Sequence, residues 1–493
     1  MHEAETGLTG LVDTGISGLD DVLHGGLTPN RLYLVEGDPG SGKTTLALQF
    51  LLAGVRRGER CLFVTLSETE EELRATARSH GWTLDGISIL EIVASEENLK
   101  PDGRYTMFHP SEVELTETMR AVLEKAEGVR PDRLVFDSLS ELRLLAQNPL
   151  RYRHQILALK QFFARQSATV LFVDDKTGDA GDMRLHSISH GVISLERRTP
   201  DYGTMRRRLQ VTKVRGRDFR QGFHDYRIVR GGLEVYPRLV AAEHLSPYTR
   251  DAVKSGVDGL DDLLGGGLSQ GTSTLILGPA GAGKSTIASQ YAVWAARQGQ
   301  HAICYLFDES IATFRERLAG LGMDAEPYIA SGRLTLRQVD AAELAPGEFA
   351  YEVRRTVDQD RSRIVVIDSL NGYLNAMPSE QFLTLHLHEL LTYLGQQGVT
   401  TILIMAQHGF AGGQVQVPID ASYLADTVLL LRYFEARGEV RQSVSVIKKR
   451  TGPHERTIRE MRFDHGIVLG EPVREFQGVL TGAPVFIGKE WTE

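Results

Sequence analysis

Two glycine-rich loops constrain this chain more than any other feature. The first is Gly37-Asp-Pro-Gly-Ser-Gly-Lys-Thr44 and the second is Gly278-Pro-Ala-Gly-Ala-Gly-Lys-Ser285, each lying between an apolar run and a helical pattern. The match extends upstream, because the lead-in at 15–27 (GISGLDDVLHGGL) reappears at 256–268 (GVDGLDDLLGGGL), at the same spacing from its loop. A repeat of this size predicts two copies of one domain and not a solenoid.

Both loops fit the pattern G-x-x-x-x-G-K-[ST] in the strand, loop and helix context that a phosphate-binding loop requires. Its glycines let backbone N–H groups turn toward phosphates at a helix N-terminus. The lysine reaches the β and γ phosphates, and the next hydroxyl holds Mg²⁺. We therefore predict ATP and Mg²⁺ as ligands. The predicted nucleotide-binding residues are Gly37, Gly40, Ser41, Gly42, Lys43, Thr44, Thr45, Gly278, Gly281, Ala282, Gly283, Lys284, Ser285 and Thr286.

An apolar run followed by an aspartate occurs once after each loop. The run at 132–136 leads into Asp137, and the run at 362–367 leads into Asp368. A buried strand followed by a turn aspartate is common, but downstream of a phosphate loop this pattern predicts a Walker B carboxylate. We therefore predict Thr44 with Asp137, and Ser285 with Asp368, as the metal-binding pairs.

Strand-like and helix-like patterns alternate along both halves of the chain. This alternation predicts an α/β fold with a mostly parallel sheet flanked by helices, and it places nucleotide at the carboxyl ends of the strands. We expect a first domain at 1–235, a linker at 236–250 and a second domain at 251–493. Leu239, Val240 and Leu245 suggest that the linker packs on a domain surface.

Composition and charge exclude several classes of protein. The chain has 493 residues, of which 42% are hydrophobic and 24% are charged, and no apolar run is long enough for a membrane span. Residues 1–6 lack the basic and apolar regions of a signal peptide, which favours the cytoplasm. A net charge of -9 argues against nonspecific nucleic-acid binding. Cys61 and Cys304 are expected to be buried thiols and not a disulfide or metal pair.

The two halves resemble the tandem RecA-type ATPases of the circadian clock protein KaiC family almost from end to end. The residues that carry the resemblance are the G-[IV]-x-G-L-D-D lead-in, both loops, the acids at 308–309 and the late stretches 426–439 and 457–461. The resemblance implies two tandem RecA-like P-loop domains that bind and hydrolyse ATP. It also implies a homohexameric double ring with ATP at subunit interfaces, a signalling switch role with KaiB-like or other signalling proteins as partners, and serine autokinase activity in the second domain.

The resemblance implies catalytic roles for three acids and four basic residues. The family ends the strand after the loop helix with two adjacent glutamates, one of which orients or activates the attacking water. Here these positions are Ser67 and Glu68 in the first half, and Asp308 and Glu309 in the second. Since Ser67 cannot accept a proton at neutral pH, hydrolysis at the first site is expected to depend on Glu68 alone or to be slow. Solvated strand ends or helix caps are the alternative reading of these acids. The family's Lys-x-Arg pair, which reaches the neighbouring subunit's γ-phosphate, matches Lys213, Arg215, Lys448 and Arg450.

Three further positions carry family roles less completely. His454 matches a family histidine near the nucleotide, and its first-half counterpart is Phe219. The family's autophosphorylated Ser-Thr pair aligns with Ser422 and Tyr423, which we predict as phosphoacceptors, with an ordinary polar loop as the alternative. The residues after about 478–488 leave little room for the family's C-terminal activator-binding tail.

Two other functions remain open at this point. The same core serves RecA/RadA-like DNA-binding ATPases in recombination or repair, and a basic cluster supports that alternative. Aromatic residues hardly interleave with this cluster, and no zinc-finger or helix-turn-helix module is evident, so nucleic acid is not the favoured partner. A non-catalytic scaffold that binds ATP is the third reading, and it depends on Ser67. The basic cluster consists of Arg197, Arg198, Arg206, Arg207, Arg208, Lys213, Arg215, Arg217 and Arg220.

Overall fold

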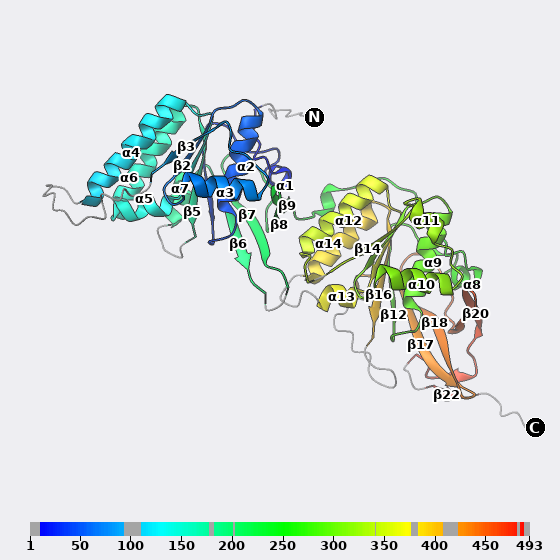
Figure 1. Ribbon diagram of the computed structural model, residues 1–493. Coiled ribbons are helices and arrows are strands. Elements are labelled where there is room, and N and C mark those ends of the chain that lie inside the picture. Colours follow the sequence, from blue (N-terminus) through cyan, green and yellow to red (C-terminus); the bar gives the residue numbers. More distant parts are fainter. Residues whose placement is uncertain are drawn as a thin grey trace, which may run out of the picture. The chain divides into compact units, whose positions relative to one another are not determined.

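The chain forms two α/β units, seen in the computed structural model in Figure 1. The structure describes residues 10–92, 110–176, 182–200, 203–340, 342–375, 383–407, 423–480 and 484–487, and the side chains at 110–114, 182–184 and 375 lie outside the description. Contacts within the chain separate Met1–Arg238 from Leu239–Glu493. The expected boundaries at 235 and 251 stay predictions.

A nine-stranded sheet forms the centre of the first unit, in the order β3-β2-β4-β5-β1-β6-β7-β8-β9. The strands from β3 to β6 pair in parallel, and β6 to β9 pair antiparallel. The predicted mostly parallel sheet is therefore confirmed. The bounds are β1 Leu32–Gly37, β2 Cys61–Thr65, β3 Ile87–Glu91, β4 Arg133–Asp137, β5 Thr169–Asp175, β6 Gly191–Arg198, β7 Arg206–Val214, β8 His224–Val229 and β9 Gly232–Tyr236.

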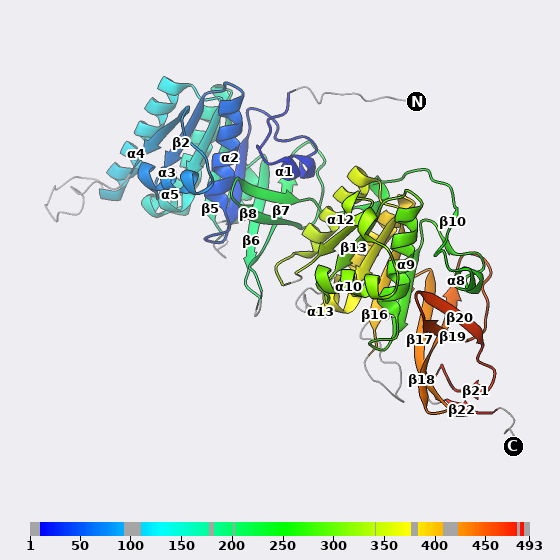
Figure 2. The same cartoon turned by 45° about the vertical axis from the view of Figure 1, so that its right-hand side comes forward.

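Helices cover both faces of this sheet, as Figure 2 shows from a second direction. Residues of the central strand β1 alternate between the two faces: Tyr33 and Val35 pack with α1, α2 and α3, whereas Leu32 and Leu34 pack with α4 to α7. Burial on both sides explains why the parallel strands are continuous apolar runs in the sequence. The bounds are α1 Ser17–Val22, α2 Lys43–Arg56, α3 Glu70–Ser79, α4 Pro110–Val129, α5 Leu139–Ala146, α6 Pro149–Arg165 and α7 Asp182–Ile188.

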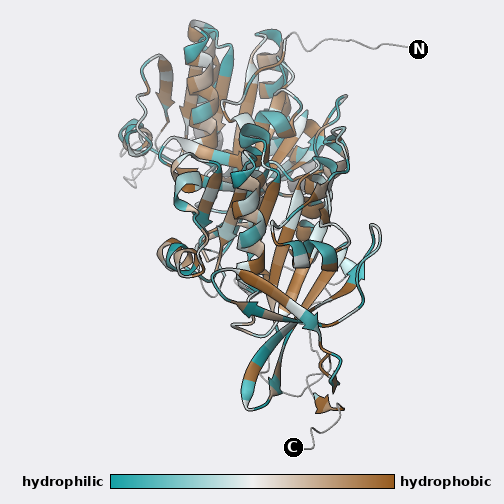
Figure 3. Cartoon of the chain, turned by 90° about the vertical axis from the view of Figure 1, so that its right-hand side faces the viewer, coloured by the Kyte–Doolittle hydropathy of each residue, from teal (hydrophilic) through white to brown (hydrophobic). Residues whose placement is uncertain are grey.

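The second unit repeats the same strand order, β14-β13-β15-β16-β12-β17-β18-β19-β20. Its central strands are mostly hydrophobic, while its helices mix hydrophilic and hydrophobic residues (Figure 3). Its sheet comprises β12 Ser273–Gly278, β13 Ala302–Leu306, β14 Leu334–Gln338, β15 Ile364–Asp368, β16 Thr400–Ala406, β17 Thr427–Ala436, β18 Glu439–Lys449, β19 Arg459–Phe463 and β20 Ile467–Pro472. Its helices are α8 Asp258–Leu263, α9 Lys284–Arg297, α10 Ile311–Gly320, α11 Glu326–Ala330, α12 Pro346–Asp360, α13 Leu370–Asn375 and α14 Leu383–Gln396.

Short elements complete the second unit. The 3₁₀ turn η2 Ala241–Glu243 lies in the segment expected to be a linker, and Leu239 and Ala241 are buried in the core of the second unit. The Ala241 N–H donates to Glu389 of α14 at 3.2 Å, whereas Leu245 is 76% exposed. This segment therefore packs on α14 through Leu239 and not through Leu245. The remaining strands are β10 Ala252–Val253, β11 Leu268–Ser269, β21 Phe476–Gln477 and β22 Val485–Phe486.

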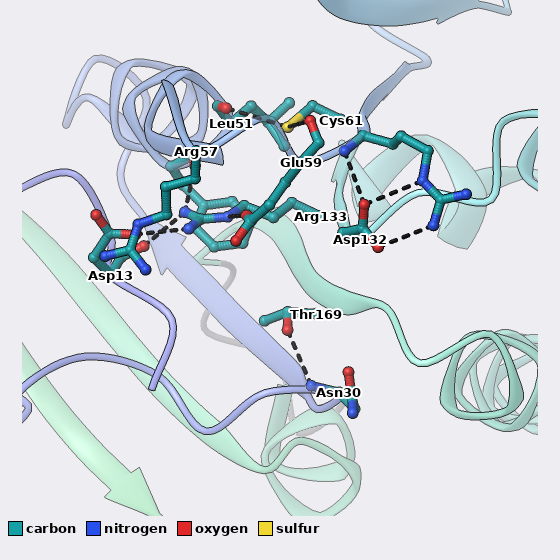
Figure 4. A network of polar contacts seen from close by, with 11 residues as sticks. Asp13, Asn30, Leu51, Arg57, Glu59, Cys61, Asp132, Arg133 and Thr169 are labelled. Carbon is teal, nitrogen blue, oxygen red and sulfur yellow. Dashed lines mark hydrogen bonds and ion pairs between the residues drawn. The ribbon is translucent and has the colours of Figure 1, made fainter. Parts of the chain in front are cut away.

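A buried guanidinium ties the lead-in of the first unit to its loop helix (Figure 4). Arg133, at the start of β4, is 1% exposed and pairs with Asp13 at 2.6 Å and with Glu59. It also donates to the Asp13 carbonyl at 2.7 Å and the Phe50 carbonyl at 2.8 Å, and its guanidinium lies over the Phe50 ring. In the second unit the corresponding strand position is Ile364. The first unit therefore uses an ion network where the second uses an apolar side chain.

Substituting Arg133 will test how much this network stabilises the first unit. Arg133→Met is expected to lower the free energy of unfolding of the first unit by about 3 kcal/mol, because Glu59 loses its ion-pair partner and Asp13 loses the closer of its two. Hydrogen exchange in increasing urea, followed on peptides from β4 and α2, measures the loss. Arg60→Met is the matched control, since Arg60 pairs with Asp132 at the surface, and its effect should be much smaller. Equal effects would contradict this account.

Candidate nucleotide-binding sites

Backbone conformation at the two loops depends on glycine. Gly42 precedes α2 with φ 94°, and Gly283 precedes α9 with φ 95°, a left-handed conformation that side chains disfavour. Space is also short, because a Cβ at Gly42 would lie 2.7 Å from Ile228 Cδ1, and one at Gly283 would lie 2.1 Å from Phe463 Cζ. The loops are therefore held close to the antiparallel part of each sheet. Ser41, Thr45, Ala282 and Thr286 are buried at the loops and first helical turns.

Each loop lysine folds back over its own loop. Lys43 Nζ donates to the carbonyls of Gly37 and Asp38, both at 3.0 Å, and pairs with Asp175 at 2.9 Å. Lys284 Nζ donates to the Pro279 carbonyl at 2.6 Å. Burial lowers the pKa of Lys284 to about 8, although Asp368 acts in the opposite direction. Both ammonium groups thus lie at the mouth of the loop, where the motif requires a phosphate partner.

The predicted metal-binding pairs are in direct contact. Thr44 Oγ1 donates to Asp137 at 2.9 Å, and the Ser285 hydroxyl hydrogen-bonds Asp368. Burial is the main cause that raises the pKa of Asp137 to about 6, with Glu68 adding to it, and burial likewise raises the pKa of Asp368. A divalent cation would offset the cost of an ionised carboxylate at these positions. The donor set of a hydroxyl and a carboxylate fits Mg²⁺, a hard cation that prefers oxygen ligands.

The acids at the ends of β2 and β13 are held differently in the two units. Glu68 follows β2 and directly precedes Thr69, which caps α3. Its Oε2 is buried without a hydrogen-bond partner among the described residues, and burial raises its pKa. In the second unit Asp308 accepts a hydrogen bond from Ser369. Glu309 forms an ion pair with Arg317 at 2.9 Å. The residue of the first unit that corresponds to Arg317 is Thr76.

The four predicted trans-acting basic residues contact backbone segments of their own unit. Lys213 on β7 donates to the Ser189 carbonyl at 2.8 Å, and Arg215 donates to the Ser187 carbonyl at 2.5 Å. Lys448 on β18 donates to the Ala425 carbonyl at 2.7 Å, and Arg450 donates to the Tyr423 carbonyl at 3.2 Å. Each Lys-x-Arg pair thus lies beside the turn that precedes β6 or β17. Their role toward a neighbouring subunit stays a prediction.

Two of the remaining predicted residues are described. His454 follows Pro453, whose carbonyl lies 2.2 Å from the place where a Cβ on Gly265 would be, so His454 sits beside the lead-in of the second unit. Phe219, its counterpart, packs on the core of the first unit. Tyr423 is 51% exposed, and Ser422 lies outside the described residues.

Two residues lie beside the first loop although the sequence did not predict them as part of this site. Asp175 ends β5 opposite Gly37, and Arg197 on β6 places Nη1 2.9 Å from where a Cβ on Gly40 would be. The sequence signal for Asp175 is an acid directly after an apolar run, and Arg197 was noted only as part of a basic cluster. In the second unit Tyr433 takes the place over the loop, and its hydroxyl donates to the Ala280 carbonyl at 3.2 Å.

The two units define a class of protein, the tandem RecA-like P-loop ATPases. The family model "ATPase: KaiC" matches residues 12–240 and again 253–472, and the chain belongs to this family. Circadian clock protein KaiC3 of Synechocystis sp. is 24% identical over 505 residues, which cover 100% of this chain and 98% of the relative. Circadian clock oscillator protein KaiC of Synechococcus elongatus is 26% identical over 483 residues, 96% of this chain and 92% of the relative.

A third relative extends the same pattern. Circadian clock oscillator protein KaiC of Picosynechococcus sp. is 25% identical over 484 residues, 97% of this chain and 92% of the relative. Membership of the family implies an ATPase that binds nucleotide. None of the described helices is both long and apolar enough to cross a membrane.

A substitution at Gly42 will test the backbone requirement of the first loop. Gly42→Ala is expected to abolish nucleotide binding at the first site, because the new Cβ meets Ile228 and forces the loop out of its left-handed conformation. The matched control is Gly58→Ala, which has φ 75° but no atom within 4 Å of the new Cβ, and should cost only about 1 kcal/mol of stability. Binding of a fluorescent ATP analogue to chains that also carry Lys284→Ala measures the effect. Unchanged binding in Gly42→Ala would refute the assignment.

Proposed function

We propose that this protein is an ATP-hydrolysing switch that assembles as a homohexameric double ring, with the first site as the main hydrolytic site. The observation that carries the proposal is the Glu68 carboxylate, which lies beside the Thr44–Asp137 pair and leaves one buried oxygen without a partner in the described part of the chain. A carboxylate with a raised pKa is a suitable acceptor for the proton of an attacking water. Glu309 is already neutralised by Arg317 and is less available for this role.

In the proposed reaction a water oxygen attacks the γ-phosphorus and its proton passes to Glu68. The bond between the γ-phosphorus and the bridging oxygen breaks, and ADP leaves with the bonding electrons. Lys43 and the loop N–H groups hold the phosphate oxygens, and Asp137 with Thr44 would hold Mg²⁺, which neutralises phosphate charge when bound. Glu68 then returns the proton to the released phosphate or to solvent. Ser67 takes no part, so the first site works with one carboxylate.

Support for a shared site comes from the match of Lys213 and Arg215 to the Lys-x-Arg pair that the resembling family supplies to a neighbouring subunit's γ-phosphate. Lys213, near the end of β7, and Arg215, just after this strand, contact the backbone of the segment 186–189. An arginine supplied in trans stabilises charge on the transferring phosphoryl group. A head-to-tail contact that closes on itself forms a ring in which each copy supplies this arginine to the next.

The DNA-binding alternative has less support, because several of its basic residues are engaged within the chain. Arg208 pairs with Glu196 at 2.8 Å and stacks on the Phe223 ring, with its guanidinium carbon 3.8 Å from the ring centre. Arg217 donates to the carbonyls of Leu23, His24 and Gly26. A surface that reads phosphates needs these groups exposed and available.

Mixing two inactive variants tests the first site and its shared character together. Glu68→Gln and Arg215→Ala, each combined with Lys284→Ala, should lower ADP release by about 100-fold or more when alone. A one-to-one mixture should recover up to about a quarter of the activity of the Lys284→Ala chain, because one interface in four then combines an intact Glu68 with an intact Arg215. Glu309→Gln should have a much smaller effect on ADP release. A mixture that stays inactive would contradict a site shared between subunits.

We also propose that the second domain phosphorylates Ser422. The support is its alignment with the phosphorylated pair of the resembling family, together with an exposed neighbour, Tyr423. Incubation with Mg-ATP should add a phosphate-sized mass to the intact chain, and Ser422→Ala should remove the gain. Lys284→Ala should also remove it, whereas Lys43→Ala should not. ADP release without a mass gain in the unmodified chain would leave an ATPase without kinase activity.

A further inference from the structure

The first loop lysine is held by three oxygen atoms of its own chain. An ammonium group has three N–H donors and no acceptor. Lys43 Nζ has three oxygen contacts within hydrogen-bonding distance, namely the carbonyls of Gly37 and Asp38 at 3.0 Å and Asp175 Oδ1 at 2.9 Å. A phosphate oxygen that approaches Lys43 therefore has to compete with these partners. Asp175 is the only one of the three that carries a negative charge and so competes with phosphate on the same terms.

The sheet holds Asp175 in this place. The parallel register of β1 with β5 sets Asp175 directly opposite Gly37, the first residue of the loop motif. Ser140, at the start of α5, donates to Asp174 at 2.8 Å and lies 3.5 Å from the second carboxylate oxygen of Asp175. Asp174 itself is buried and paired with Arg143, and it accepts the Asp175 N–H at 3.0 Å. Hydrogen bonds and an ion pair thus hold Asp174 and Asp175 at the end of β5, and Asp175 faces Lys43.

In the second unit the corresponding strand end, that of β16, has uncharged residues at these positions. The residue opposite Gly278 is Ala406, and Met405 takes the place of Asp174. Asn371, which corresponds to Ser140, accepts the Ala406 N–H at 2.7 Å and donates to the Ala406 carbonyl at 3.2 Å. A side chain from α5 or α13 holds the strand end by hydrogen bonds in both units. Among the described residues, only the strand end of the first unit presents a carboxylate to the loop lysine. The difference between the two sites is therefore one of charge and not of backbone.

We propose that Asp175 is a positioning residue of the first site, a counter-ion that competes with the nucleotide's phosphates for Lys43 and so makes the first site bind ATP more weakly than the second. The inference rests on the proposed function, because it concerns the same first site. Asp175 is 42% exposed, so solvent screens the pair and the competition is moderate. A triphosphate carries more charge than one carboxylate and still displaces it. Release of nucleotide products from the first site is correspondingly faster, because Asp175 can pair with Lys43 again as the product leaves.

The first experiment removes the charge and keeps the shape. In full-length chains that carry Lys284→Ala, titration with a fluorescent ATP analogue and Mg²⁺ reports the first site. Asp175→Asn should lower its Kd by about two- to fivefold. The gain should shrink at high salt, because the pair is partly exposed, and loss of a merely structural contact would not respond in this way. Asp175→Ser serves as a second variant and should act in the same direction.

The second experiment adds the charge where the chain lacks it. In chains that carry Lys43→Ala, which report the second site, Ala406→Asp should raise the Kd about two- to fivefold. Ala406→Asn is the matched control of equal size and should leave the Kd close to its starting value. An equal effect of both substitutions would overturn the proposal, since bulk and not charge would then be responsible.

The outcomes separate this inference from the proposed function. If the Lys284→Ala chain binds the nucleotide and Asp175→Asn leaves the Kd unchanged or raises it, the inference is wrong while the first site remains a nucleotide site. If the Lys284→Ala chain binds no nucleotide, the proposed function of the first site fails, and the inference fails with it. A lower Kd in Asp175→Asn together with a higher Kd in Ala406→Asp supports the proposal.

Discussion

The parallel pairing of β1 with its neighbours is the constraint on which the first site depends. Strand β1 lies between β5 and β6, and the loop begins where β1 ends, at Gly37. Because parallel strands end at the same edge, Glu68 after β2, Asp137 at the end of β4 and Asp175 at the end of β5 arrive beside a loop that is distant from them in sequence. The apolar faces of the strands hold this register, so the charged groups at the edge need not contribute to stability. They are available for function and can differ between the two units.

The two units show how far such charges can change within one fold. Arg133 with its two carboxylates in the first unit corresponds to Ile364 in the second, and Asp174 with Asp175 corresponds to Met405 with Ala406. In each case the first unit pairs its charged side chains with specific partners, whereas the second has apolar side chains at the corresponding positions. Replacing a buried ion network by apolar residues is compatible with a stable fold when the whole set changes together. The strand order is identical in both units, in keeping with this view.

Much of the fold could be predicted from the sequence, because its signals are local. The two loops, the apolar runs before Asp137 and Asp368 and the alternation of strand and helix indicated tandem RecA-like domains, and the structure and the family match confirm them. The pairing of Lys43 with Asp175, of Glu309 with Arg317 and of Arg133 with Glu59 was not predicted. Two of these pairs join separate elements, and their contacts are decided by strand register, while the Glu309–Arg317 pair depends on side-chain direction from a helix. Leu245 shows the opposite error, since an apolar residue expected to pack is exposed.

The contrast between Glu68 and Glu309 argues for a division of labour between the two sites. Both follow a buried strand and precede a helix cap, so backbone position alone would assign them the same role. Arg317 forms an ion pair with Glu309, whereas the corresponding residue in the first unit is the uncharged Thr76, and burial raises the pKa of Glu68. A general base must accept a proton readily, and a carboxylate that is already held in an ion pair does so less readily. In the proposed mechanism the same motif thus serves proton transfer from water in the first unit and charge balance in the second, where Ser369 also donates a hydrogen bond to the Asp308 carboxylate.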